Sequence, residues 1–107
     1  MITIAPNIEL DFATHYSHND CLVIRRTAPM KEGEESILDV AEKFANGIHG
    51  QIVSHPKGNK PGEMYVRVAS REYERALWFS GKRKPDVNAV DDNTLKMLWD
   101  AANNPNF

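Results

Sequence analysis

The spacing of the apolar residues changes several times along this chain, and each change limits the folds open to it. Residues 8–12 alternate between apolar and acidic side chains, as a half-buried strand requires. Residues 37–48 instead repeat apolar side chains every three or four positions, as one face of a helix does. Alternation returns over 63–69, and helical spacing returns after Ser70 and after residue 91. This mixture of periods predicts the α+β class.

Turn-forming and capping residues predict where these elements begin and end. Runs of β-prone residues predict two further strands at 21–25 and 51–54, and a short edge strand is expected at 86–90. For the first helix, we expect Glu34 and Glu35 in the first turn and a left-handed stop at Asn46-Gly47, with Ile48 as an alternative end.

The second helix is expected to be capped by Ser70 and the third by Asp91 or Asp92, because short polar side chains accept hydrogen bonds from the first free N–H groups. Both tryptophans fall on these helices. We expect both in the core, although Trp78 lies beside the apolar stripe and is therefore also a candidate interface residue.

The predicted fold is an antiparallel sheet with helices on one face. It has a ferredoxin-like β-α-β-β-α-β core at about 21–90, an N-terminal strand and a C-terminal helix. The 107 residues are expected to form a single domain, 1–107. The expected core packs one face of the strands against the first helix, through Leu22, Ile24, Met64, Val66 and Val68 on the strands and Ile37, Val40, Ala41 and Phe44 on the helix.

The segment Pro61-Gly62-Glu63-Met64-Tyr65-Val66-Arg67-Val68-Ala69-Ser70-Arg71-Glu72, followed by Glu74-Arg75-Ala76-Leu77, resembles the third strand and second helix of an RNA recognition motif. Gly62, Tyr65 and Val66 align with the family pattern, whereas Glu63 and Val68 stand where that family has aromatic residues. The resemblance implies the plait fold and a sheet face that binds RNA, but two of the rings that stack on bases are replaced.

Charge is distributed unevenly along the chain, although the net charge is only −2. Residues 51–85 hold eight Lys and Arg against three Glu, whereas the segments before and after are acidic. The loop at 55–62 contains two lysines and two glycines but lacks the spacing of a Walker phosphate loop, so a phosphate contact there is the minor alternative to a solvated turn. Lys82-Arg83-Lys84 follows a helix end, where basic side chains complement the helix dipole.

Metal binding and nucleophilic catalysis are weakly indicated. His15, His18, Asp20 and Cys21 lie within seven residues, but no second pair of ligands completes a zinc site. Cys21 is expected to be a core thiol, because nothing indicates a lowered thiol pKa. With a single cysteine, no signal-like N-terminus and no apolar run of membrane length, we expect a cytoplasmic protein with no metal, no cofactor and no membrane contact.

No catalytic motif is present, so we expect a non-catalytic binding module that acts through a protein partner and is not an enzyme. Inhibitors and accessory proteins of phages or mobile elements are an analogy of size. The alternative is binding of RNA or single-stranded nucleic acid through the sheet face and the basic hairpin loop. For either role, the predicted binding residues are Arg25, Tyr65, Arg67, Lys57 and Lys60.

Overall fold

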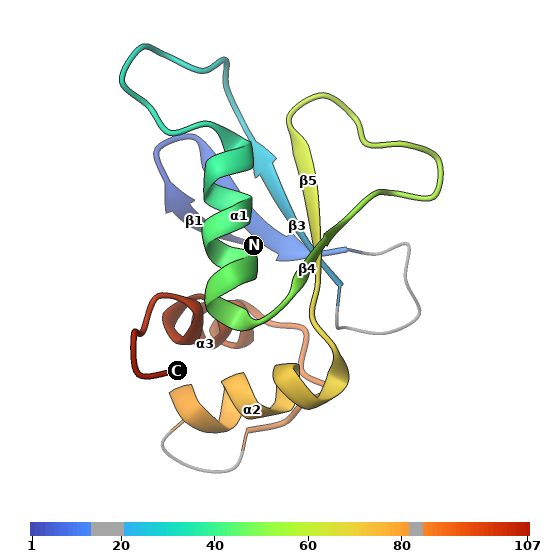
Figure 1. The fold of residues 1–107 in the computed structure, drawn as a ribbon, viewed down its shortest axis with the longest axis vertical. Helices are drawn as coiled ribbons and strands as arrows, with labels where there is room; N and C mark the ends of the chain where they lie inside the picture. The colour runs from blue at the N-terminus through green and yellow to red at the C-terminus, as the bar shows by residue number, and fades with distance from the viewer. Residues whose placement is uncertain (14–20, 82–84) are drawn as a thin grey trace.

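The computed structural model describes residues 1–13, 21–81 and 85–107, which form one antiparallel five-stranded sheet and three helices (Figure 1). The sheet order is β1-β2-β3-β5-β4. The strands are β1 (Ile2–Ala5), β2 (Ile8–Phe12), β3 (Cys21–Arg26), β4 (Gln51–Val53) and β5 (Glu63–Arg67), and the helices are α1 (Ile37–Ile48), α2 (Ser70–Ser80) and α3 (Asp92–Ala102). The predicted α+β class and antiparallel sheet are confirmed.

The element order β3-α1-β4-β5-α2 supplies the first five parts of the expected plait. The sixth part, a strand at 86–90, is absent from these residues, so that prediction is wrong. They form a turn in which the Ala89 N–H donates to the Asp86 carbonyl and the Asn88 N–H donates to the Asp86 carboxylate. The sheet position next to β3 is occupied by β2, which pairs with β3 on one side and with β1 on the other. Strand β1 was not predicted from the sequence.

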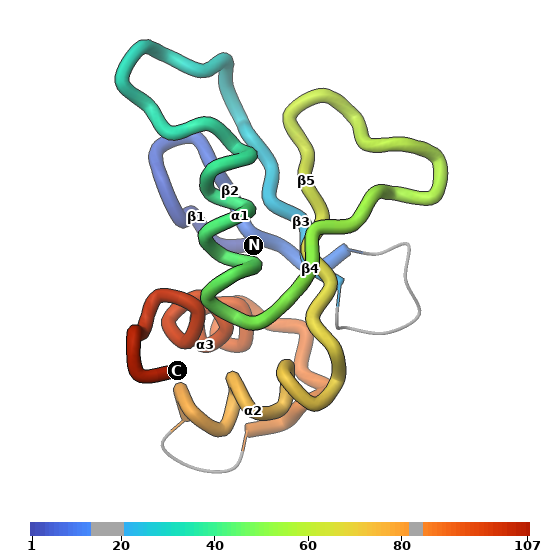
Figure 2. The backbone as a smooth tube through the Cα atoms, viewed as in Figure 1, coloured from blue at the N-terminus to red at the C-terminus, as the bar shows by residue number. Residues whose placement is uncertain are grey.

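The helices lie on one side of the sheet but cover it unequally. Helix α1 packs along β3, β4 and β5, and α3 contacts β1 and β2. Helix α2 packs mainly on α3 at one end of the sheet, whereas the long loops at 27–36 and 54–62 project from the opposite end (Figure 2).

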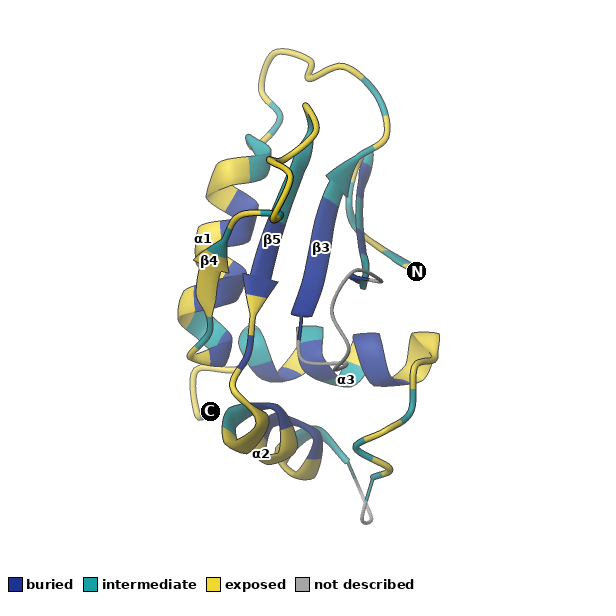
Figure 3. Cartoon of the chain, turned by 90° about the vertical axis from the view of Figure 1, so that its right-hand side faces the viewer, coloured by how far each residue is buried: buried dark blue, intermediate teal, exposed yellow. Residues whose placement is uncertain are grey.

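The main core lies between the sheet and the helices, as expected. Leu22, Ile24 and Val66 are fully buried on the helical face, together with Phe44 of α1. Met64 and Ile37 are only partly buried but pack against the same cluster. The burial of β3 is nearly complete along its length, whereas α2 keeps one side exposed (Figure 3).

Several helix ends differ from their predictions. Helix α1 begins after Ser36, whose hydroxyl accepts from the Asp39 N–H. Glu34 and Glu35 precede the helix because Arg26 holds the loop there: its guanidinium donates to the Glu35 carbonyl and lies 3.8 Å from the Glu34 carboxylate.

The left-handed residue at the end of α1 is His49 and not Gly47. Gly47 lies inside the helix, where a Cβ would be 1.9 Å from the Ala102 carbonyl oxygen of α3. The glycine therefore permits close packing of α1 on α3 and does not end the helix.

The N-terminal cap of α2 differs from the prediction, whereas that of α3 agrees with it. Ser70 is the first residue of α2, and the cap position is Ala69, which makes no side-chain hydrogen bond. Asp91 caps α3 as predicted, and its carboxylate accepts from both the backbone N–H and the hydroxyl of Thr94.

Candidate functional site

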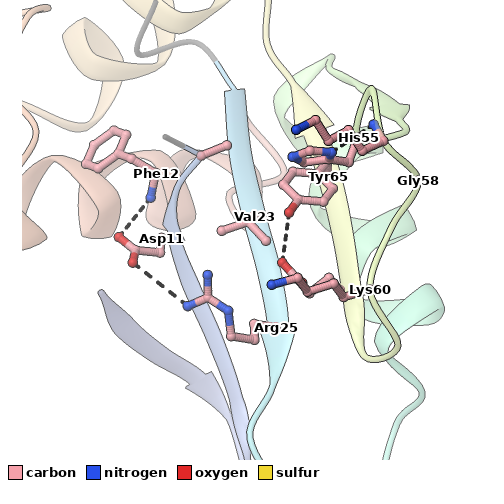
Figure 4. A pocket seen from close by; sticks show the side chains of 11 residues that line it. Asp11, Phe12, Val23, Arg25, His55, Gly58, Lys60 and Tyr65 are labelled. Atoms are coloured by element: carbon pink, nitrogen blue, oxygen red, sulfur yellow. Dashed lines mark hydrogen bonds and ion pairs between the residues drawn. The ribbon is translucent and has the colours of Figure 1, made fainter. Parts of the chain in front are cut away.

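Four of the five predicted binding residues line a single pocket on the side of the sheet away from the helices (Figure 4). Arg25 comes from β3, Tyr65 from β5, and Lys57 and Lys60 from the loop between β4 and β5. The pocket has a volume of about 450 Å³. Its other lining residues are Asp11, Phe12, Ala13, Val23, His55, Gly58 and Glu63.

Arg67 is the predicted residue that does not line this pocket. It borders a separate hollow with His49, Gln51, Ala69 and Ser70, near the start of α2. Glu63 and Tyr65 of β5 therefore line the first pocket, whereas Arg67 at the end of the same strand lines the second hollow.

The floor of the pocket is a small second core. Val23 is 2% exposed and Tyr65 is 7% exposed, and both cluster with Ala13 and Cys21. Tyr65, one of the predicted binding residues, is therefore buried and does not form part of an open sheet face. The loop that follows β4 folds back over this side of the sheet, so that the His55 and Tyr65 ring centroids are 5.6 Å apart. A side chain on the helix-free face of a sheet is buried whenever a loop packs against it.

The acidic groups of the pocket are held by neighbouring donors. The Asp11 carboxylate accepts from the Phe12 N–H at 2.8 Å and lies 4.0 Å from the Arg25 guanidinium. The Glu63 carboxylate accepts from the Tyr65 hydroxyl at 2.8 Å. Figure 4 shows Asp11 and Phe12 on one side of Val23, and His55, Tyr65 and Lys60 on the other.

Burial raises the pKa of Tyr65 to about 12, and the hydrogen bond to Glu63 adds to the shift. Desolvation and a neighbouring carboxylate both disfavour the phenolate. The hydroxyl therefore stays protonated near neutral pH and acts as a hydrogen-bond donor, not as a base.

The loop that carries the two lysines is ordered by its own hydrogen bonds. The His55 N–H donates to the Asn59 side-chain oxygen at 2.8 Å, and the Lys57 N–H donates to the His55 Nδ1 at 3.0 Å. The Gly58 N–H donates to the His55 carbonyl at 2.8 Å, with Gly58 at φ +85°. These bonds hold the backbone at Lys57 and Gly58 against the edge of the pocket.

The candidate metal ligands fall mostly outside the described part of the chain. His15, His18 and Asp20 lie in the stretch 14–20, which the structure does not describe. Cys21 is fully buried in the second core, as expected for a core thiol. Among residues 1–13, 21–81 and 85–107, no three His, Cys, Asp or Glu side chains are grouped closely enough to hold a metal ion. In the same residues, no helix combines the length and hydropathy needed to cross a bilayer.

A second candidate surface lies on α2 and at the C-terminus. Trp78 is 48% exposed and Phe79 is 43% exposed, so the expectation of a buried Trp78 is wrong, and Trp78 stays a candidate interface residue. The Phe79 ring packs edge-on against Phe107, with centroids 5.2 Å apart, and the Arg75 guanidinium lies 4.8 Å from the Phe107 centroid. We refer to Arg71, Arg75, Trp78, Phe79 and Phe107 as the α2 surface.

Pattern analysis missed Phe79, although a signal was present. The inward positions of α2 are Tyr73, Ala76 and Leu77. Phe79 lies two positions after Leu77 and three after Ala76, which places it beside that stripe, roughly 160° from Leu77 and roughly 60° from Ala76. An apolar ring placed off the buried stripe indicates a surface site.

Comparisons with models of protein families, with curated proteins and with solved structures gave no match for this chain. The resemblance to an RNA recognition motif therefore stays a prediction, and any functional argument depends on the pocket and the α2 surface.

Proposed function

We propose that this chain is a non-catalytic binding module that docks onto a partner protein through the α2 surface. The observation that carries the proposal is the exposure of two adjacent aromatic side chains, Trp78 and Phe79, on one helix. Trp is among the residues most enriched at the energetic centres of protein interfaces.

Burial of the two rings at an interface would contribute substantially to the free energy of association. Burying about 100 Å² more of each ring, at about 25 cal/mol per Å², would contribute about 2 to 3 kcal/mol per ring. The Phe79 ring is already placed by Phe107, so little of that gain is lost in ordering it.

The charge around these rings suggests the chemistry of the partner. Arg71 and Arg75 are both exposed on α2, but Arg75 pairs with Glu72 at 3.2 Å and Glu74 is also exposed, so the helix itself carries two basic and two acidic side chains. The basic excess comes from Lys82-Arg83-Lys84, which follows the helix in the sequence. Opposite charge at the rim favours encounter with the correct partner. We therefore infer a partner that presents an apolar cleft with acidic side chains at its border.

Binding of a nucleic-acid strand across the sheet face has less support. Tyr65, the ring that the resemblance assigns to base stacking, is 7% exposed and covered by His55. Binding of single-stranded nucleic acid without sequence preference depends on several accessible aromatic rings. Two further parts of the proposal depend on the sequence alone. The single cysteine supports a cytoplasmic location, and the size of the chain supports the analogy with inhibitors or accessory proteins of phages or mobile elements.

The test compares two double variants of the full chain. Trp78→Ala with Phe79→Ala removes the aromatic pair, and Leu38→Ala with Ile52→Ala removes two other exposed apolar side chains as a matched control. Each chain is used to capture proteins from the source cells, and a captured protein is then purified and titrated calorimetrically.

We expect a protein that binds the wild type and the control equally and binds the aromatic variant at least about 30-fold more weakly, the effect of removing one energetic centre of an interface. Circular dichroism must show that both variants are folded. Equal affinity of all three chains, or no protein that distinguishes them, would contradict the proposal.

A further inference from the structure

The pocket on the helix-free side of the sheet has properties that the α2 surface does not use. We propose that this pocket binds the phosphate group of a small phosphorylated molecule, with Arg25, Lys57 and Lys60 as the cationic groups. The inference is independent of the proposed docking of α2, because the two sites share no residue.

The pocket carries an excess of positive charge. Its two carboxylates are both engaged, Asp11 with the Phe12 N–H and Arg25, and Glu63 with the Tyr65 hydroxyl. No described carboxylate forms an ion pair with Lys57 or Lys60, and both side chains are exposed. Hydrogen bonding does not remove the charge of either carboxylate, so the three cationic side chains of the pocket exceed its two carboxylates by one positive charge, and this excess attracts an anion.

The loop that carries the two lysines is preorganised. The bonds among His55, Lys57, Gly58 and Asn59 hold the loop without a ligand, so binding does not have to order its backbone. A Cβ added at Gly58 would meet no protein atom within 4 Å, which means that the loop backbone borders open space at this point. Part of the cost of ordering an anion site is therefore already met by the fold.

The volume and lining of the pocket indicate the size and chemical class of the ligand. A volume of about 450 Å³ suits a molecule of the size of a sugar phosphate or a mononucleotide. A phosphate monoester carries close to two negative charges near neutral pH, which matches the two unpaired lysines, and a guanidinium such as that of Arg25 suits phosphate oxygens. The Asp11 and Glu63 oxygens and the side chains of Phe12 and Val23 remain for hydroxyl groups and apolar parts of the same ligand.

A single strand of nucleic acid is the other source of phosphate, and the observations favour it less. Three rings line the pocket: Phe12 and His55 are half-buried and Tyr65 is buried, so successive bases have no fully exposed platform. The small monoester is therefore the ligand that we infer.

The test is a titration of the full chain, followed by proton–nitrogen correlation spectra and by the melting temperature. The probes are inorganic phosphate, ribose 5-phosphate and adenosine 5′-monophosphate, with ribose and adenosine as unphosphorylated controls. A short oligothymidylate without a terminal phosphate represents the nucleic-acid backbone.

We expect at least one of the two phosphate monoesters to shift the amide signals of Lys57, Gly58 and Lys60 saturably and to raise the melting temperature, whereas ribose and adenosine do neither. Lys57→Gln with Lys60→Gln should weaken that binding at least about tenfold, because two charge-assisted contacts are removed. Lys31→Gln with Lys96→Gln, which changes two exposed lysines outside the pocket, should leave it unchanged.

Three results would overturn the inference: no saturable binding of either monoester up to millimolar concentration, equal binding by the pocket variant and the wild type, or equal binding of the unphosphorylated controls. Binding of the oligothymidylate in the absence of monoester binding would also overturn it and would assign the pocket to a nucleic-acid backbone. None of these results bears on the Trp78 and Phe79 variants, so failure here is distinguishable from failure of α2 docking.

Discussion

The two faces of the sheet bury their residues in different ways. On the helical face, Leu22, Ile24 and Val66 join one continuous apolar cluster with all three helices. On the opposite face, four residues form a separate small cluster: Ala13, Cys21, Val23 and Tyr65. Val23 and Tyr65 of that second cluster line the same pocket as five charged side chains, namely Asp11, Arg25, Lys57, Lys60 and Glu63.

The difference indicates how a small domain can combine stability with recognition. A large aliphatic cluster provides most of the free energy of folding, because that energy grows with the apolar area removed from water. The smaller cluster buries the floor of a pocket and leaves Arg25, Lys57 and Lys60 near solvent. We therefore expect changes on the helical face to affect stability most, and changes at the rim of the other face to affect binding.

The largest effect is expected for Val66→Asp on the helical face. Val66 is fully buried, and an unpaired carboxylate there should lower the free energy of unfolding by about 4 kcal/mol or more, or prevent folding. Denaturant unfolding measures the change. Ile52→Asp is the matched control, because Ile52 pairs directly with Val66 in the sheet but is exposed at the edge. If both variants were equally stable, the assignment of the two faces would be wrong.

A smaller loss is expected for Tyr65→Ala on the opposite face. Removing a ring that is 93% buried should cost about 3 kcal/mol, because a cavity remains in the second cluster. Tyr65→Phe keeps the ring and removes only the donor to Glu63, so it should cost about 1 kcal/mol. A Tyr65→Ala protein as stable as the wild type would mean that the second cluster does not contribute to folding.

The smallest effect is expected at the cap of α3, the helix that helps to close the helical face. Hydrogen bonds from the Thr94 backbone N–H and hydroxyl lower the pKa of the Asp91 carboxyl. A lowered folded-state pKa gives stability that is fully present above the unfolded-state pKa of about 3.9 and is lost as the pH falls through the folded-state value.

The melting temperature of Asp91→Ala should therefore lie below that of the wild type at neutral pH, and the difference should shrink in acid below about pH 4. Thermal melts of both proteins across this range provide the measurement. A difference that stays the same at every pH would show that the charge of the cap does not contribute.

Local patterns accounted for most elements of the fold. The strands β2, β3 and β5 and all three helices follow from period and capping, as do the helical-face residues Leu22, Ile24 and Val66. The sequence also contains a signal for burial on both faces of β3. Cys21-Leu22-Val23-Ile24 is a continuous apolar run, and such runs are typical of strands that are buried on both faces. That run was the available signal for the second cluster beneath the pocket.

Local pattern could not identify which strand lies beside β3. A strand at 86–90 and the N-terminal hairpin were both compatible with alternating residues, and only the completed sheet places β2 there. The same limit applies to Gly47, whose role depends on Ala102, a residue far away in the sequence.

For the candidate sites, too, local sequence predicts some features, and contacts with distant residues decide others. The residue types that suit a site can be read directly from the chain: the lysines at 57 and 60, Arg25 next to an apolar run, and an aromatic pair at 78 and 79. Their exposure cannot, because the packing of distant segments places Tyr65 beneath a loop and leaves Trp78 and Phe79 in solvent. Periodicity records which side of an element is apolar, whereas exposure depends on which distant segment packs against that side.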